Sequence, residues 1–312
     1  MSVIYTGMEN YVIQTQGLSK KYGDKLAVNN VDMHVPQGSV YGFVGENGSG
    51  KTTIMRLLMG LAIPTSGQYA LFGVDSKDRK IQEVRHHISA IVEAPSLVPS
   101  LSAYDNLKYA CLYYGITNYK EVIPEALKNV GLENTGKKAA KHFSLGMRQR
   151  LGIAVLLLNN PTLMLLDEPM NGLDPSGVAE LRNLIIDLNK KGISFIISSH
   201  ILSELEKVAT HYGFISHGKL LKEISATDLA LECQKYTDLK YGEPQKLEKE
   251  LLALGYKDIK AYPNSVRIYD DVKPLELLKA LEKKGIEISD VKTSEMNVED
   301  YYLNLIGGEK NV

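Results

Sequence analysis

The stretch that most constrains the fold of this 312-residue chain is the glycine-rich segment Gly45-Glu46-Asn47-Gly48-Ser49-Gly50-Lys51-Thr52. It matches the P-loop pattern G-x-x-x-x-G-K-T, which joins a strand to a helix and cradles the phosphates of a nucleoside triphosphate. An apolar run of strand length, residues 39–44, precedes it, and residues 53–59 carry apolar side chains at helical spacing. This context distinguishes the motif from a glycine turn that carries a lysine by chance.

Each residue type in the motif has a physical role in holding phosphate. Small residues let the backbone curl so that N–H groups point at phosphate oxygens, and the helix N-terminus adds partial positive charge. Lys51 can reach the β- and γ-phosphates, and the Thr52 hydroxyl can ligate Mg²⁺. The residues predicted to contact ATP in this segment are Gly45, Asn47, Gly48, Ser49, Gly50, Lys51, Thr52 and Thr53.

The composition is that of an ordinary globular protein. The hydrophobic fraction is 44%, the charged fraction is 23% and the formal net charge is −1, so no global positive field favours nucleic acid. Cys111 and Cys233 lie far apart without metal-ligand spacing, which fits a reducing compartment. We expect no signal peptide, and the longest purely apolar run, residues 153–158, is too short to cross a bilayer. A membrane function would need another chain to supply the crossing.

The order of predicted elements indicates an α/β domain over residues 11–224 with an inserted helical subdomain at about 98–158. Apolar strands alternating with helices are typical of a mainly parallel sheet covered on both faces. The first strands are expected at 11–16 and 25–35, and a helix is expected at 201–209. A linker at 225–235 is expected to lead into a small domain over 236–312. Its order βαββαβ is typical of a ferredoxin-like α+β sandwich, for which we expect a regulatory or dimerising role.

Two carboxylates follow the apolar strand predicted at 162–166. Asp167 ends a buried strand, where it can hold Mg²⁺ through water beside a P-loop. Glu168 then faces the crevice at the carboxyl end of the sheet, where it can act as a general base towards the attacking water. The alternative is an ordinary polar strand end.

Together these features resemble the nucleotide-binding domain of ABC transporter ATPases, over roughly residues 11–224. The segment Phe143-Ser144-Leu145-Gly146-Met147 stands where this family has its signature motif, usually LSGGQ. The resemblance implies that Ser144 and Gly146 bind the γ-phosphate held by the opposite subunit, so that two chains enclose two ATP molecules. Leu145 and Met147 depart from the usual pattern, and capping of a helix by Ser144 is the alternative role.

Three further residues match family motifs. Asp174, in Asn171-Gly172-Leu173-Asp174, resembles the loop that passes between the two sites. His200 resembles the switch histidine that contacts the γ-phosphate, and Tyr22 resembles the aromatic residue that stacks on adenine. A structural histidine at a strand end and a tyrosine in a surface turn are the alternatives.

Glu93 stands where the family has a glutamine that bridges Mg²⁺ and water and passes motion to the membrane partner. We predict that Glu93 shares Mg²⁺ with Thr52 and Asp167; a solvated strand end is the alternative. A glutamate here, together with Ser-Leu-Gly-Met-Arg-Gln-Arg at 144–150, resembles the ATP-binding subunits of bacterial peptide-antibiotic exporters. These include the bacitracin-resistance and lantibiotic-immunity types.

The resemblance implies an ATP- and Mg²⁺-dependent ATPase that forms a homodimer on separate permease chains at the cytoplasmic face of the membrane. Its implied task is export of a peptide antibiotic. The alternatives are export of another amphipathic compound, a soluble ABC-type ATPase of DNA repair or translation, and a non-hydrolytic scaffold. Soluble ABC-type ATPases of DNA repair or translation usually carry a coiled-coil insertion, a second cassette or a basic stripe, and the sequence shows none of these. We therefore expect no nucleic-acid partner. The presence of Lys51, Asp167, Glu168 and His200 argues against the scaffold.

Overall fold

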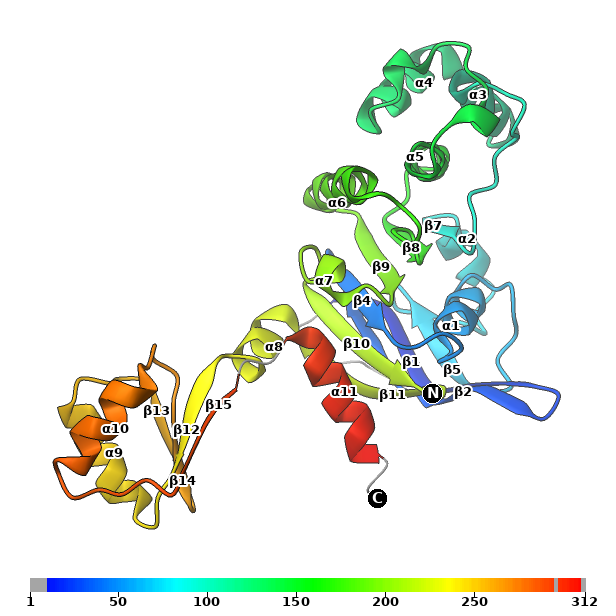
Figure 1. Ribbon diagram of the computed structural model, residues 1–312. Helices are drawn as coiled ribbons and strands as arrows, with labels where there is room; N and C mark the ends of the chain where they lie inside the picture. Colours follow the sequence, from blue (N-terminus) through cyan, green and yellow to red (C-terminus); the bar gives the residue numbers. More distant parts are fainter. Residues whose placement is uncertain (1–9, 295–296, 310–312) are drawn as a thin grey trace. The chain divides into compact units, whose positions relative to one another are not determined.

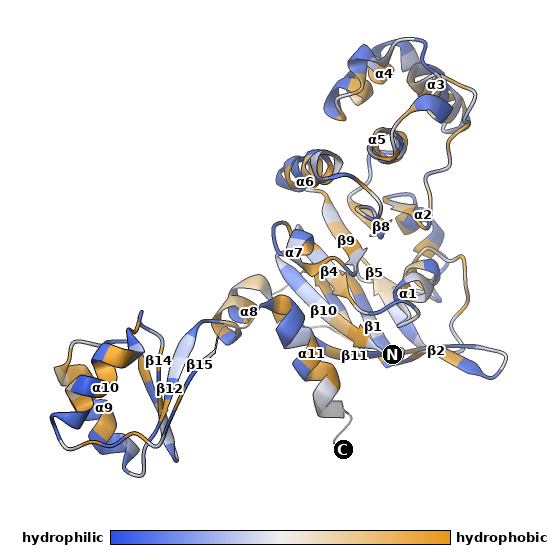
Figure 2. Ribbon diagram, viewed as in Figure 1, coloured by the Kyte–Doolittle hydropathy of each residue, from blue (hydrophilic) through white to orange (hydrophobic). Residues whose placement is uncertain are grey.

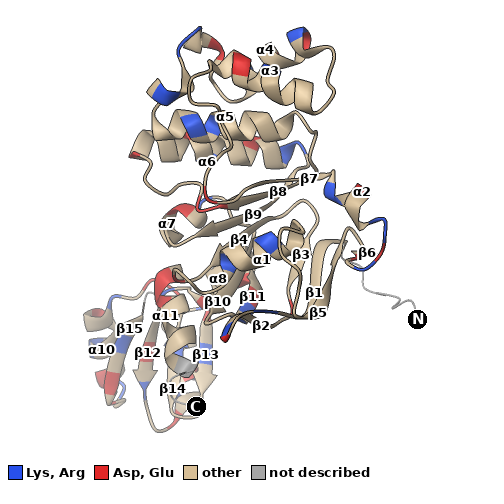
Figure 3. Cartoon of the chain, turned by 90° about the vertical axis from the view of Figure 1, so that its right-hand side faces the viewer, with Lys and Arg blue, Asp and Glu red and all other residues tan. Residues whose placement is uncertain are grey.

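The computed structural model describes residues 10–294 and 297–309, and the chain divides into two compact units, Met1–Ala226 and Thr227–Val312 (Figure 1). Among these described residues, no helix is long and apolar enough to cross a membrane. Basic residues, blue in Figure 3, and acidic residues, red, are interspersed along the helices and strands.

A six-stranded sheet forms the centre of the first unit, in the order β11-β10-β4-β9-β8-β7. Its strands are β4 (Val40–Val44), β7 (Ile88–Ile91), β8 (Leu163–Asp167), β9 (Ser194–Ser199), β10 (His211–Ser216) and β11 (Lys219–Ser225). All neighbours pair in parallel except β10 and β11, so the predicted mainly parallel sheet is confirmed. Every residue of β4, β8 and β9 is buried, and Figure 2 shows hydrophobic residues along these strands.

A second, antiparallel sheet packs on the same core and was not predicted. Its strands are β1 (Tyr11–Tyr22), β2 (Lys25–Val31), β3 (His34–Pro36), β5 (Ser66–Leu71) and β6 (Val74–Asp75). The predicted strand at 11–16 continues to Tyr22, where a tight turn leads into β2. The predicted strand at 25–35 is broken between Val31 and His34, because β2 and β3 pair with different parts of β1.

Helices cover the parallel sheet and form the inserted block. They are α1 (Lys51–Leu58), α2 (Ile81–Arg85), α3 (Ala103–Tyr113), α4 (Tyr119–Asn129), α5 (Leu145–Leu157), α6 (Pro175–Lys190) and α7 (Leu202–Leu205), with 3₁₀ turns η1 (Glu133–Thr135) and η2 (Ala140–His142). Helices α3, α4 and α5 pack together between β7 and β8 in the chain, and α5 also packs on α6. The helix expected at 201–209 is wrong in length, because α7 ends at Leu205 and the chain enters β10 at His211.

The second unit contains a four-stranded antiparallel sheet in the order β13-β14-β12-β15. Its elements are α8 (Ala226–Glu232), β12 (Tyr236–Lys240), α9 (Pro244–Ala253), β13 (Ile259–Tyr262), β14 (Ser265–Ile268), α10 (Pro274–Glu282), β15 (Asp290–Ser294) and α11 (Val298–Glu309). The predicted order βαββαβ is confirmed, and leucines of α9 and α10 pack on one face of the sheet. Helix α8 occupies most of the segment 225–235 that was expected to be a linker.

Candidate active site

The P-loop lies between β4 and α1, and neighbouring backbone leaves room only for glycine at two of its positions. A Cβ atom on Gly45 would lie 2.5 Å from the carbonyl oxygen of Ile215, and one on Gly50 would lie 2.6 Å from that of Ala27. Gly50 also has a φ of +114°, a conformation that disfavours residues with a side chain. The loop is therefore held by packing against the ends of other strands.

Lys51 is the first residue of α1 and its side chain is buried, with the residue 5% exposed. Its Nζ donates hydrogen bonds to the carbonyl oxygens of Gly45 (2.6 Å) and Glu46 (3.1 Å). The same Nζ lies 3.6 Å from Glu168 Oε1. A buried cation thus lies within the curl of the P-loop, where it can contact a bound phosphate.

Asp167, at the end of β8, joins the P-loop helix to the neighbouring strand β9. Thr52 Oγ1 donates to Asp167 Oδ2 (2.7 Å), and Ser198 Oγ donates to Oδ1 (2.5 Å). Hydroxyl and carboxylate oxygens are the donors that Mg²⁺ prefers. The described residues contain no group of three or more acidic, histidine or cysteine side chains able to hold a metal. Thr52 and Asp167 therefore fit Mg²⁺ if phosphate oxygens and water complete its coordination.

Glu168 is held by His200 and by Ser198. Glu168 Oε2 lies 2.7 Å from His200 Nδ1 and accepts a hydrogen bond from the His200 backbone N–H (3.3 Å). Its own backbone N–H donates to Ser198 Oγ (2.8 Å), and its φ is +48°. Oε1 has no hydrogen bond among the described residues. The structure therefore brings Lys51, Thr52, Asp167, Glu168 and His200 together.

Ser198 is the residue of this site that sequence reasoning missed. It lies opposite Asp167 in the β8–β9 register and contacts both carboxylate residues. The available signal was a serine near the end of an apolar strand, two positions before the expected switch histidine. That signal needs the adjacency of β8 and β9 to become informative.

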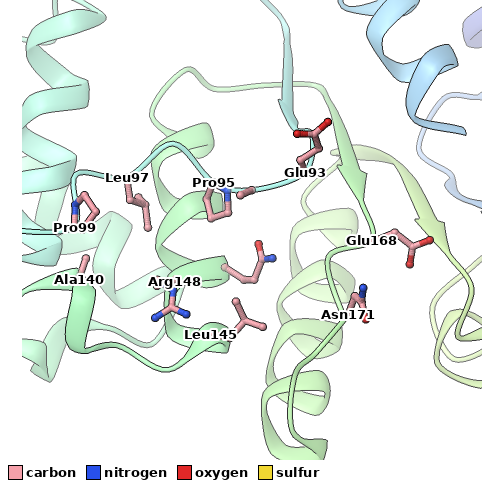
Figure 4. A pocket seen from close by; sticks show the side chains of 11 residues that line it. Glu93, Pro95, Leu97, Pro99, Ala140, Leu145, Arg148, Glu168 and Asn171 are labelled. Atoms are coloured by element: carbon pink, nitrogen blue, oxygen red, sulfur yellow. The ribbon is translucent and has the colours of Figure 1, made fainter. Parts of the chain in front are cut away.

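Glu93 follows β7 and does not contact Thr52 or Asp167 among the interactions of the described residues. Its carboxylate pairs instead with Arg56, one helical turn after Thr52 on α1, and its side chain is 68% exposed. It borders a cavity of about 320 Å³. Figure 4 shows Glu93, Glu168 and Asn171 on one side of this cavity and Leu145 and Arg148 on the other.

Ser144, Gly146 and Asp174 lie near the N-termini of two helices that pack together. Ser144 Oγ accepts from the Met147 N–H (3.2 Å) and caps α5, and Asp174 Oδ1 accepts from the Gly177 N–H (3.1 Å) and caps α6. No hydrogen bond joins them to the P-loop within the described part of the chain. Tyr22 is exposed at the end of β1, with Lys20 Nζ 4.9 Å from its ring centroid.

Comparisons with known proteins agree with this geometry. The family model for ABC transporters matches residues 28–171. The bacitracin transport ATP-binding protein BcrA of Bacillus licheniformis is 42% identical over 303 residues, which cover 95% of this chain and 98% of BcrA. The lantibiotic transport ATP-binding protein SrtF of Streptococcus pyogenes is 45% identical over 212 residues, covering 68% and 90%. A dimeric ATP-binding cassette solved in a post-hydrolysis state with ADP and Pi superimposes with a TM-score of 0.61 at 22% identity, covering 69% and 98%.

Proposed function

The chain belongs to the ABC transporter ATP-binding family, and from that premise we propose that two copies enclose ATP and Mg²⁺ and power export of a peptide antibiotic through separate membrane chains. The observation that carries the ATPase part is the bridge from Thr52 through Asp167 and Ser198 to Glu168. This bridge holds a metal-ligating pair and a carboxylate base at one end of the parallel sheet, next to a buried lysine.

The chemistry follows from the positions of these groups. Lys51 and the loop N–H groups would bind the phosphates, and Thr52 and Asp167 would hold Mg²⁺, which would supply charge neutralisation at the transferred phosphoryl group. Glu168 takes the proton of the attacking water. Its contact with His200 orients the carboxylate, and the histidine would contact the γ-phosphate of bound ATP.

The dimer is supported by residues that cap helices but form no hydrogen bond with their own P-loop in the part of the chain that the structure describes. Ser144 and Asp174 begin α5 and α6, whose free N–H groups and partial positive charge favour an anion. A second copy would present its γ-phosphate to Ser144 and Gly146. Each ATP site would therefore need the P-loop of one copy and Ser144 and Gly146 of the other copy.

For Glu93 we propose a coupling role near the metal. Its partner Arg56 lies on the same helix as Thr52, and Glu93 begins the segment that leads to α3. If the Glu93 carboxylate left Arg56 and bound the metal, the segment that Glu93 begins would move when nucleotide binds. Because the carboxylate is exposed, the exchange requires little desolvation.

The substrate class is supported by the extent of the bacitracin match. That match continues through the second unit of this chain, whereas the lantibiotic match covers about the length of the first unit. A peptide antibiotic that acts at the membrane is therefore the favoured cargo. Export of another amphipathic compound is the alternative outcome of the test.

The test uses a peptide-sensitive bacterium that expresses the chain together with a candidate membrane permease. We expect increased resistance to bacitracin or a lantibiotic, and loss of that resistance with Glu168→Gln. Glu83→Gln, an exposed change on α2, is the matched control and should keep resistance. Resistance that survives Glu168→Gln would refute the proposal, as would protection only against non-peptide amphiphiles.

A further inference from the structure

The sheet of the second unit has one face covered by α9 and α10 and one face that carries aromatic and cationic side chains. Side chains alternate along a strand, so that Leu239, Val266 and Ile268 point into the core under the two helices. Arg267 lies between two of these core residues and therefore belongs to the opposite face. Side chains of the two remaining helices, α8 and α11, lie over this opposite face.

A cavity of about 500 Å³ lies over this face. This volume is within the range typical of small-ligand sites, about 300–1,000 Å³, whose walls are mostly apolar or aromatic with a few polar groups. The sheet contributes Tyr236, Lys260, Arg267 and Tyr269, while Leu231 of α8 and Leu305 of α11 contribute apolar wall. We call it the sheet-face cavity.

Arg267, which lines the sheet-face cavity, lies against two aromatic rings. Its guanidinium carbon lies 4.4 Å from the ring centroid of Tyr236 and 4.5 Å from that of Tyr262. A guanidinium stacked in this way keeps its N–H groups at the edge of its plane, where they can meet a carboxylate or phosphate. Its Nε has no hydrogen bond among the described residues.

The charges around Arg267 leave a second cation unbalanced. Asp238, opposite Arg267 in the β12–β14 register, approaches Arg267 Nε at 3.6 Å, too far for a hydrogen bond. Lys260 Nζ lies 5.3 Å from the ring centroid of Tyr269 and forms no ion pair among the described residues. Glu232, the acidic residue of the wall, accepts a hydrogen bond from the Tyr301 hydroxyl (2.7 Å).

We propose that the sheet-face cavity binds a small amphipathic organic anion, with its carboxylate or phosphate at Arg267 and Lys260 and its apolar body against the tyrosine rings and the leucines. A purely structural cation–π stack would account for Arg267, but it would not require an open cavity with apolar and aromatic walls beside a second cation that has no ion pair among the described residues. The site lies wholly within the second unit and is independent of ATP chemistry.

The test is equilibrium binding of naphthalene probes to the full chain. The chain contains no tryptophan, so naphthalene fluorescence can be excited separately from the protein. The probes are 1-naphthoate, 1-naphthyl phosphate and 1-naphthylmethylammonium, each measured with excess ADP to occupy the nucleotide site. We expect saturable binding of at least one anion, and the preferred anion identifies the acidic group. The cation should not bind.

Lys260→Gln and Arg267→Gln should each weaken anion binding at least tenfold, as expected for loss of a charge-assisted hydrogen bond. Lys279→Gln, an exposed charge change on α10, should leave it unchanged. If Arg267→Gln does not fold, Lys260→Gln decides alone. Equal binding of the cation, an anion affinity that falls when the ADP concentration is raised further, absence of saturation, or an equal loss with Lys279→Gln would overturn the proposal.

Discussion

Replacing Ser198 by alanine tests whether one hydroxyl positions both carboxylate residues of the active site. The Ser198 hydroxyl donates to Asp167 Oδ1 and accepts from the Glu168 N–H. The residue is fully buried, at 0% exposure, so solvent does not already surround either group. The change removes one oxygen atom and alters two partners at once.

The magnitude follows from these two contacts. A hydrogen bond to a charged group contributes about 1.5–3 kcal/mol, and a buried donor left unpaired costs about 1–3 kcal/mol. We therefore expect Ser198→Ala to lower the free energy of unfolding by about 3 kcal/mol. In a domain of this size that corresponds to a fall in Tm of about 6–12 °C. Because Glu168 also loses its backbone anchor, kcat for ATP hydrolysis should fall by about tenfold to a hundredfold.

The assay is thermal unfolding followed by circular dichroism, together with steady-state phosphate release. Ser89→Ala is the matched control, because Ser89 is also a buried serine of the parallel sheet, but among the described residues its hydroxyl makes a single, long hydrogen bond, 3.4 Å to the Leu156 carbonyl. In that control, the free energy of unfolding should fall by at most about 1 kcal/mol and ATP hydrolysis should be unchanged. If Ser198→Ala melts and hydrolyses like Ser89→Ala, the bridging role of the hydroxyl is refuted.

Four other changes test the remaining assignments. Lys51→Ala should abolish ATP hydrolysis and most ATP affinity, measured with a fluorescent ATP analogue; normal turnover would remove the P-loop assignment. Glu168→Gln keeps the shape but loses the base, so an ATP-bound dimer should accumulate in sizing chromatography with Mg-ATP, and an active monomer would contradict this. Gly146→Asp should fold, since the nearest atom to an added Cβ is 3.6 Å away, and should bind ATP without hydrolysing it; unchanged hydrolysis would disprove the shared site. Glu93→Ala removes a surface ion pair worth at most about 1 kcal/mol, so stability should hold while peptide resistance falls more than basal hydrolysis; full resistance would exclude coupling.

The parts of the molecule that short sequence patterns could predict are those determined by neighbouring residues. The P-loop is a local strand-to-helix turn, and Asp167 and Glu168 directly follow an apolar strand, so their placement at one sheet edge followed from the parallel topology. The order of the second unit was likewise readable from alternating apolar positions and from Pro244 and Pro274 at helix starts.

The parts that were missed depend on pairing between distant segments. Residues 20–22 are polar and read as a loop, yet β1 extends through them because Lys20 to Tyr22 find backbone partners in β2. Ser198 gains its role from lying beside Asp167, which requires the strand order. Glu93 has Arg56 as a partner through a contact across 37 positions that no local pattern indicates.

The backbone of Glu93 bears on how this protein would respond to selection for heat resistance alone. Its φ of +73° is a left-handed conformation that costs a residue with a side chain about 1–2 kcal/mol, whereas glycine adopts it freely. The exposed ion pair between Glu93 and Arg56 stabilises the fold by less than this conformational cost. Glycine at this position would therefore give the more heat-resistant protein, and a library screened only for survival of the fold should enrich it. Glutamate at this position therefore lowers the stability of the fold, and the coupling task that we propose for its carboxylate would account for that cost.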